Sequence, residues 1–552
     1  MKFFCIPSSL FACKNGIVEH SDFSQLKLET VPKEIIKSRK HIEELLLNVN
    51  SIEELPPDLF RCTKIRKLDV SENKIKVIPT EIGMLFSLEE LNLSKNEIVE
   101  IPEEIGYCQN LVCLDISTNI LTGFPKSFVD LTNLASLNLS NNSLTNLPAD
   151  IDRLVNLQFL DIAQCELRSL PPSIVHLRLL KVLDLCDNYL PNLPSDMGGM
   201  VSLEMLDLHC NMVTHLPEGL LNCIALRSLD ISGNQLTELP ENIGDLQNLV
   251  ELAMCENQIR QLPSSIGQLK HLEVLKCAKN CLSELTPSIC SCVHLTDLII
   301  SENRLKELPS TIGNLSRLRF LDLNSNELYS VPSTIGGCSS LTILSLRHNK
   351  IDELPLEIGK LERLQVLDVI ENNLRHLPFT LTVLYNKKTL SALWLSFNQP
   401  SLPKLSPANE PIMNMKVLTC YLLPQQEQPQ KHSSQNKSSS CVGGARVCFA
   451  GDRTEEFEED KIPIGKFERY DTPHPKPFAP KNRNRNSTEL STAVPPISSS
   501  RNEKSEAQNF SVNNNKSTDQ FIEQESRPLR SVLKKRPQSV LSLISTSELL
   551  PA

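Results

Sequence analysis

Residues 88–106 read LEELNLSKNEIVEIPEEIG, and this stretch decides the fold because its pattern recurs along most of the chain. Leu91 and Leu93 alternate with polar residues, as in a short strand with one buried face. The asparagine at 96 belongs to a series spaced by 23 residues, at 50, 73, 96, 119 and 142 and again at 188, 211, 234, 257, 280, 303, 326, 349 and 372. A fixed period of this kind predicts a solenoid of stacked units.

The repeating unit is LxxLxLxxNxLxxLPxxIG, and about seventeen copies cover residues 17–398. Cys165 takes the asparagine position in the one gap, and the last copy ends at Asn398 after three extra residues. Stacked strands predict one long parallel sheet, and each asparagine amide is expected to bond the backbone of adjacent turns. The units resemble leucine-rich repeats, which implies an α/β solenoid, a horseshoe with a parallel concave sheet, followed by a disordered tail.

The composition of the 552 residues limits the possible functions. A net charge of −10 argues against a general nucleic-acid binder, and 40% hydrophobic residues supply a large core. The sequence contains no GxxxxGKS/T phosphate-binding loop, no GxGxxG motif that opens a helix, and neither an HExxH nor a GxSxG hydrolase motif. We therefore predict a protein that is not an enzyme, with no cofactor, no metal and no small-molecule substrate.

Five cysteines share one position of the repeat, where other units carry leucine. They are Cys62, Cys108, Cys223, Cys292 and Cys338. A residue that replaces leucine is expected to be a buried, reduced thiol, which is typical of a cytosolic or nuclear protein. No paired CxxC motif indicates zinc. The apolar N-terminus suggests a secretory signal as an alternative, but Pro7 interrupts it and Lys14 ends it.

The slots six, four and two residues before each asparagine are expected to face out of the concave sheet. Aspartate recurs four before the asparagine, and larger side chains occupy some flanking slots. We select as partner-binding candidates Asp115, Phe159, Asp161, Asp184, Met205, Asp207, His209 and Asp230. They predict a docking strip for a basic or mixed partner with apolar anchors. The alternative is that aspartate is simply a common, solvated residue at this strand position.

The chain changes character after the repeats. We predict an N-terminal membrane-anchor segment at 1–16, repeats at 17–398, a C-terminal cap at 399–426 and a disordered tail at 427–552. The apolar run from Val417 to Leu423 is expected to cover the hydrophobic end that every solenoid must cap. The tail is rich in Ser, Asn, Gln, Lys and Pro, which is typical of disorder.

Three further segments resemble the LAP family of leucine-rich-repeat and PDZ proteins. They are LSALWLSFNQ at 390–399 with KVLTCYLLPQQ at 416–426, the opening 5–13 with VPKEI at 31–35, and RYDTPHPK at 469–476. The likeness is Scribble-like, with a Lano-like layout because no PDZ domain follows. It implies a membrane-associated scaffold for apical–basal polarity and cell junctions. The expected location is the cytoplasmic face of the basolateral plasma membrane, and also the cytoplasm.

The same resemblance implies S-acylation of Cys5 and Cys13, which would attach the chain to the inner leaflet. Both cysteines lie near lysines and phenylalanines, outside the register of the repeats. The alternative is that Cys13 and Phe11 pack into an N-terminal cap.

Two short motifs lie in the tail. Arg446, Val447 and Phe449 fit the RVxF form that docks to the catalytic subunit of protein phosphatase 1, where an added edge strand would place both apolar side chains in one groove. Ser531 and Ser539 lie in a basic stretch suited to phosphorylation. The alternatives are random coil for the first motif and a solvated charged tail for the second.

Two other classes of function compete with this interpretation. A Shoc-type signalling scaffold would recruit protein phosphatase 1 and a Ras-like GTPase, and an extracellular ectodomain would recognise ligands outside the cell. The segments after the repeats favour the LAP-type scaffold over the first, and the leucine-slot cysteines disfavour the second.

Overall fold

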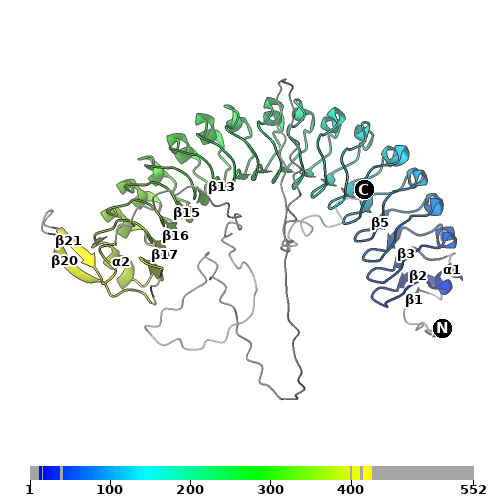
Figure 1. The fold of residues 1–552 in the computed structure, drawn as a ribbon, viewed down its shortest axis with the longest axis horizontal. Coiled ribbons are helices and arrows are strands. Elements are labelled where there is room, and N and C mark those ends of the chain that lie inside the picture. Colours follow the sequence, from blue (N-terminus) through cyan, green and yellow to red (C-terminus); the bar gives the residue numbers. More distant parts are fainter. Residues whose placement is uncertain are drawn as a thin grey trace, which may run out of the picture. The chain divides into compact units, whose positions relative to one another are not determined.

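The computed structural model of the chain describes residues 11–14, 17–37, 41–397, 399, 401–410 and 415–425. All of them belong to one compact unit. This unit is an arc with strands along its inner side and short helices along its outer side (Figure 1). The horseshoe with a parallel concave sheet, predicted from the 23-residue period, is therefore confirmed.

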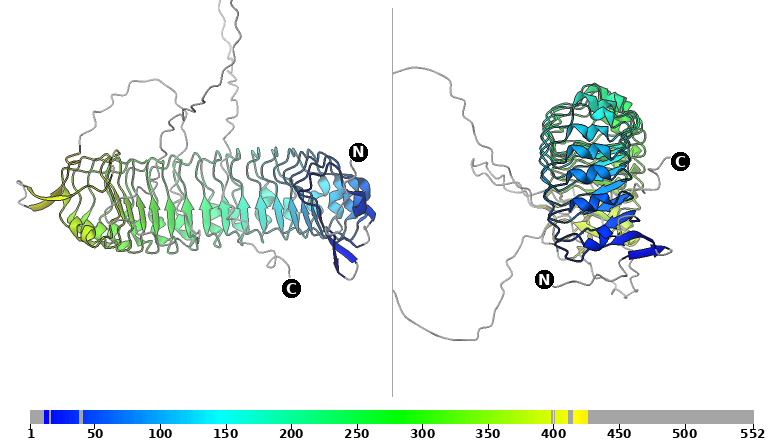
Figure 2. Two further views of the ribbon diagram at one scale, coloured as in Figure 1. Left: turned by 90° about the horizontal axis from the view of Figure 1, so that it is seen from below. Right: turned by 90° about the vertical axis from the view of Figure 1, so that its right-hand side faces the viewer.

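The strands are short and in register. β2 (Ile17–Asp22) is followed by parallel strands that each pair with their predecessor, up to β17 and then β19 (Ala392–Trp394). Figure 2 shows them side by side in one row. Between those ends lie β3 (Glu44–Leu46), β4 (Lys67–Asp69), β5 (Glu90–Asn92), β6 (Cys113–Asp115), β7 (Ser136–Asn138), β8 (Phe159–Asp161), β9 (Val182–Asp184), β10 (Met205–Asp207), β11 (Ser228–Asp230), β12 (Glu251–Ala253), β13 (Val274–Lys276), β14 (Asp297–Ile299), β15 (Phe320–Asp322), β16 (Ile343–Ser345) and β17 (Val366–Asp368).

The outer side of the arc carries 3-10 helices. Most start after a proline such as Pro102, whose φ of −71° and ψ of 152° are extended. Proline fixes φ near this value, so it sets the direction in which the short helix begins. The helices are η2 (Pro57–Arg61), η3 (Thr80–Met84), η4 (Glu103–Tyr107), η5 (Lys126–Asp130), η6 (Ile151–Arg153), η7 (Pro172–His176), η8 (Met197–Gly199), η9 (Glu218–Asn222), η10 (Ile243–Asp245), η11 (Ser264–Gln268), η12 (Pro287–Ser291), η13 (Ile312–Asn314), η14 (Ser333–Gly337) and η15 (Leu356–Lys360).

The core fills the space between the sheet and these helices. The central residue of each strand points inward, as Leu160, Leu183 and Leu206 do with no exposed surface. Isoleucines such as Ile105 in η4 close the core from the outer side and are also buried. Each repeat thus buries its leucines against its neighbours, which is why a single unit would not be stable alone.

The asparagines form a hydrogen-bonded ladder that joins consecutive repeats. The Asn96 amide nitrogen donates to the carbonyl oxygens of Val70 at 3.1 Å and Leu93 at 3.0 Å, and its oxygen accepts from the Ile75 backbone N–H at 3.0 Å. The pattern repeats from Asn73 to Asn372. Buried backbone groups at the turn are thereby satisfied, as the sequence predicted.

The five leucine-slot cysteines lie in the core with no exposed surface. The thiol of Cys108 donates to the carbonyl oxygen of Ile82 at 3.4 Å, and burial raises the pKa of that thiol to about 12. No cysteine whose side chain the structure describes takes part in a disulfide. In the asparagine gap, the thiol of Cys165 donates to the carbonyl oxygen of Leu139. It therefore replaces one bond of the missing amide.

Additional elements cover both ends of the array. At the N-terminal end, β1 (Phe11–Lys14) pairs antiparallel with β2, and α1 (Lys33–Lys37) follows. At the C-terminal end, α2 (Leu381–Asn386) stands where the sequence has extra residues. A separate antiparallel sheet is formed there by β18 (Leu377–Pro378), β20 (Ser406–Glu410) and β21 (Met415–Thr419). Val417, Leu418 and Leu423 are buried, and Leu418 and Leu423 belong to the same hydrophobic core as the leucines of the repeats.

Gln425 completes the ladder at this end. Its side-chain oxygen accepts from the Leu374 backbone N–H at 3.1 Å, and its nitrogen donates to the carbonyl oxygens of Val369 at 2.9 Å and Leu395 at 3.0 Å. These are the bonds that one more asparagine would make. Asn398, which the repeat period assigns to this rung, lies outside the described residues. The segment after the repeats is therefore joined to the last turn by its backbone chemistry as well as by apolar contact.

No helix in the described ranges combines the length and the apolar character that crossing a membrane requires.

Candidate functional site

The concave face is built from the first and third residues of each strand and from the residue two positions beyond. In β8, β9, β10 and β11 the middle leucine is buried and the two flanking residues are half-buried. This alternation follows from strand geometry, which sends successive side chains to opposite faces. The structure places all eight candidate residues in these outward-facing slots, from Asp115 in β6 to Asp230 in β11.

Four aspartates stand next to one another in consecutive strands. Asp161 pairs with Asp184, Asp184 with Asp207, and Asp207 with Asp230. Neighbouring strands are about 4.8 Å apart, so four carboxylates follow one another at that spacing. We call these four residues the aspartate row. Asp115 is separated from it by Asn138 in β7.

Each aspartate of the row also has a local structural role. One carboxylate oxygen accepts a hydrogen bond from the backbone N–H two residues later, for example His209 N–H to Asp207 at 2.9 Å and Ala163 N–H to Asp161 at 3.0 Å. Asp184 and Asp230 make the same bond. The bond satisfies a backbone donor where the strand ends.

The local role needs an oxygen but not a charge. Asn92 and Asn138 occupy the same slot in β5 and β7, and their side-chain oxygens accept the same backbone bond at 3.0 Å. Like charges on adjacent strands are unfavourable. Four consecutive aspartates therefore carry a charge that the hydrogen bonds of the turn do not require.

Burial and charge act together on the middle of the row. Burial, followed by the neighbouring Asp184 carboxylate, raises the pKa of Asp207 to about 6. Burial also raises the pKa of Asp115, although the Ser117 backbone N–H bonded to it opposes that change. A bound cationic group would relieve the repulsion in the row.

An apolar strip lies beside the aspartate row. Phe159 pairs with Val182, and Val182 pairs with Met205, at the first positions of β8, β9 and β10. All three side chains are half-buried. The sequence interpretation named Phe159 and Met205 but missed Val182, although Val182 lies six residues before Asn188 in the same slot.

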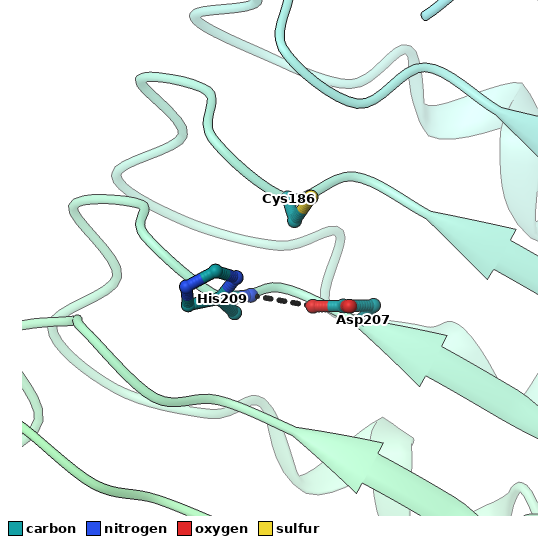
Figure 3. A group of neighbouring side chains, drawn as sticks. All are labelled: Cys186, Asp207 and His209. Carbon is teal, nitrogen blue, oxygen red and sulfur yellow. Dashed lines mark hydrogen bonds between the residues drawn. The ribbon is translucent and has the colours of Figure 1, made fainter. Parts of the chain in front are cut away.

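His209 lies two residues after Asp207 and close to the thiol of Cys186, a residue that the sequence analysis did not select. Cys186, Asp207 and His209 offer ligand atoms that lie within 4.8 Å of one another (Figure 3). CxxC spacing does not indicate this group, because Cys186 belongs to one repeat whereas Asp207 and His209 belong to the next. The signal was the distance of 23 residues from Cys186 to His209, which is one full repeat.

The other candidate residues stand before and after the repeats. Cys5, Arg446, Val447, Phe449, Ser531 and Ser539 lie outside the described residues. Cys13 belongs to β1, whose backbone pairs with β2.

The repeats match two family models. The model described as "Leucine-rich repeat region" matches residues 131–218 and 207–288. The model described as "Leucine rich repeat" matches residues 40–98 and 293–351. A solved leucine-rich-repeat protein from Leptospira interrogans is 31% identical, with a TM-score of 0.63. That match covers 68% of this chain and 95% of the solved one.

Two curated relatives match shorter stretches. Leucine-rich repeat-containing protein 7 of Rattus norvegicus is 39% identical over 83 residues, which are 15% of this chain and 6% of the relative. Protein Scribble homolog let-413 of Caenorhabditis elegans is 43% identical over 104 residues, 17% of this chain and 14% of the relative. This chain thus aligns with only a small part of either relative. From its repeats, its fold and the match to the solved protein, the chain belongs to the leucine-rich-repeat proteins.

Proposed function

We propose that this chain is a protein-binding scaffold that holds a basic segment of a partner protein on its concave face. The observation that carries the proposal is the aspartate row, whose charge exceeds what its hydrogen bonds require. Paired carboxylates on a fixed sheet provide a preorganised field for Lys or Arg side chains.

The apolar strip suits an amphipathic partner. Phe159, Val182 and Met205 run parallel to the aspartate row, one slot away on the same face. A segment with basic residues along one line and apolar residues along the next would contact both. Half-buried aromatic and methionine side chains are typical anchors of protein interfaces. We expect the partner to be basic and apolar in alternation, rather than uniformly charged.

We propose further that the scaffold is of the LAP type and works in apical–basal polarity and cell junctions. The similarity to the Scribble homolog supports this, together with the segments at 390–399 and 416–426. In this proposal, acylation of Cys5 and Cys13 holds the chain at the cytoplasmic face of the basolateral plasma membrane, with a further pool in the cytoplasm. Arg446, Val447 and Phe449 would add a phosphatase docking motif.

Proximity labelling in polarised epithelial cells tests the concave-face proposal. The variant Asp161→Asn/Asp184→Asn/Asp230→Asn keeps each acceptor oxygen and removes three charges. The matched control is Asp69→Asn, in the same slot of β4 and with the same backbone bond to Ser71 at 2.9 Å. Asp69 is flanked by Leu46 and Asn92, so it has no charged neighbour in register.

We expect the triple variant to lose a group of labelled proteins that the wild type and Asp69→Asn both retain. An unchanged set of labelled proteins would show that the aspartate row does not recruit a partner.

The membrane proposal has its own test. Cys5→Ser/Cys13→Ser is expected to move the chain from the membrane fraction to the cytosol. Two acyl chains would hold the wild type stably at the membrane, whereas the variant could carry neither of them. Equal hydroxylamine-sensitive acyl labelling of the variant and the wild type would refute acylation at these positions.

A further inference from the structure

Cys186 and His209 are brought together by the register of the repeats. Each stands two residues before a ladder asparagine, Cys186 before Asn188 and His209 before Asn211. β9 and β10 pair in register from Val182 with Met205 to Asp184 with Asp207. The same slot in consecutive repeats is therefore adjacent in space, on the concave side.

Asp207 completes a group of three possible ligands. It lies two residues before His209, so both side chains leave the same face. Figure 3 shows the imidazole, the carboxylate and the thiol next to one another, with ligand atoms within 4.8 Å. In the ranges that the structure describes, this is the one group of three Cys, His, Asp or Glu residues with ligand atoms this close.

These three residue types fit zinc. Zn²⁺ bonds thiolate sulfur at about 2.3 Å, imidazole nitrogen at about 2.0–2.1 Å and carboxylate oxygen at about 2.0–2.2 Å, in a tetrahedron. Such bonds place the ligand atoms about 3.3–3.6 Å apart. The three atoms would therefore have to draw together by about an ångström, which rotation of the side chains can supply.

The surroundings already hold the group in place. One oxygen of Asp207 accepts from the His209 backbone N–H at 2.9 Å, which leaves the second oxygen for a cation. Asp184 accepts from the Cys186 backbone N–H at 3.1 Å in the same way. Asp184 and Asp230 flank Asp207 in register, so the local field favours a cation.

The fold does not require cysteine or histidine in this slot. Serine occupies it at positions 71, 94, 117, 140, 232 and 301. Cys186 has no exposed surface, and His209 beside it is half-buried. A cysteine and a histidine stand in this slot of adjacent repeats only at positions 186 and 209.

We propose that Cys186, Asp207 and His209 bind one Zn²⁺, with the fourth coordination position left for water or for a side chain of a bound protein. Binding displaces the thiol proton into solvent, so that the thiolate and the carboxylate balance the two charges of the ion. The site belongs to the free chain and does not depend on the proposed function.

Slot-matched variants test the site in the full-length, reduced protein. Cys186→Ser and His209→Ser each introduce the residue that other repeats carry there, so the fold is expected to persist. Cys255→Ser is the control, because Cys255 occupies the same slot beside Ser232 and Ala278 instead of a histidine. Zn²⁺ affinity is measured by competition with a chromophoric chelator. Cobalt is then bound in place of zinc, to look for thiolate-to-metal charge transfer in its spectrum.

We expect one tight Zn²⁺ equivalent and a cobalt charge-transfer band in the wild type and in Cys255→Ser. In Cys186→Ser the band disappears, and in both Cys186→Ser and His209→Ser the affinity falls more than about 100-fold, beyond the loss typical of supporting residues. Asp207→Asn keeps the bond from the His209 N–H but weakens zinc binding. Equal zinc binding by Cys186→Ser, His209→Ser and Cys255→Ser would overturn the proposal, because it would assign the metal to other thiols. The proposal would also be overturned if the wild-type protein bound no Zn²⁺ tightly.

The concave-face test leaves Asp207 intact. A failure of the partner-binding test would therefore leave the zinc proposal standing, and a failure of the zinc titration would leave the partner-binding proposal standing.

Discussion

One residue in nearly every repeat holds a left-handed backbone conformation, directly before the ladder asparagine. Val49 has φ 56°, Lys95 has φ 55° and Gly233 has φ 66°. This conformation turns the chain so that the asparagine can reach the adjacent repeat. The left-handed conformation raises the free energy of a residue that has a side chain by about 1–2 kcal/mol, whereas glycine adopts it without this cost. A β-branched residue such as Val49 is the least suited of these three.

Val49→Gly is expected to stabilise the N-terminal repeats by about 1 kcal/mol, because it removes this strain from a side chain that is 37% exposed. The reverse change in the same slot, Gly233→Val, should destabilise, since a Cβ there would meet the Cys210 sulfur at 3.1 Å. Both changes can be followed by the urea midpoint of unfolding. A loss of stability in Val49→Gly would contradict this explanation.

Asp368 in β17 gives a prediction about pH. It is buried, accepts the Ile370 backbone N–H at 3.1 Å, and has its pKa raised from 3.8 to about 6 by burial, against the attraction of Arg347. Because the folded pKa lies above the unfolded one, ionisation destabilises the fold as pH rises from about 4 through about 6, and the effect is absent below that range.

Asp368→Asn keeps the acceptor oxygen and removes the charge. It should therefore stabilise the protein by roughly 3 kcal/mol near neutral pH, with the gain vanishing near pH 4. Denaturant unfolding of both proteins across this pH range measures the difference. A difference that does not change with pH would argue against burial as the cause.

At the scale of the element, the capping segment ends the ladder through Gln425. That side chain satisfies the Leu374 N–H and the carbonyls of Val369 and Leu395. An unpaired buried backbone group costs about 1–3 kcal/mol, so the three bonds tie the cap firmly to the last repeat.

Gln425→Ala is expected to destabilise the C-terminal repeats by about 2–4 kcal/mol and to speed amide hydrogen exchange in β17 and β19. Gln425→Glu keeps the acceptor for the Leu374 N–H but loses the donor, so its effect should be intermediate. Unaltered exchange in β17 and β19 would mean that the apolar contacts of Val417 and Leu418 hold the cap without the ladder bonds.

The elements differ in how far the sequence could predict them. Leu91, Asn96 and Cys108 were placed correctly because each slot recurs every 23 residues and local chemistry decides its role. Gln425 was not predicted as a rung, since it lies outside the period and reaches the turn only through the folding of the cap. Sequence patterns describe repeated contacts better than single ones.

The concave site shows the same limit. The slots of Asp207, His209 and Phe159 followed from the period, and the structure places them as expected. The raised pKa of Asp207 depends on burial and on Asp184 in the next strand, so no single repeat could show it. Val182 and Cys186 were missed because each is an ordinary residue until its neighbour across the sheet is considered.

At the scale of the whole molecule, the solenoid turns a local pattern into an extended surface. One aspartate in one repeat is a solvated strand residue, while four in register form a field that a long basic segment can follow. The rigid spacing of the strands fixes the distance between the carboxylates. Binding therefore does not cost the free energy of ordering these side chains. The central claim is therefore that charge in this row, and not the fold alone, gives the concave face its affinity.

The most direct measurement is the Kd of a partner recovered by proximity labelling, titrated against the purified wild type and Asp161→Asn/Asp184→Asn/Asp230→Asn at low and high salt. If the charge of the row supplies the affinity, we expect the Kd of the variant to be at least about tenfold weaker at low salt. The difference between the two Kd values should be smaller at high salt, because salt screens the charges. Equal Kd values for the two proteins at low salt would contradict it.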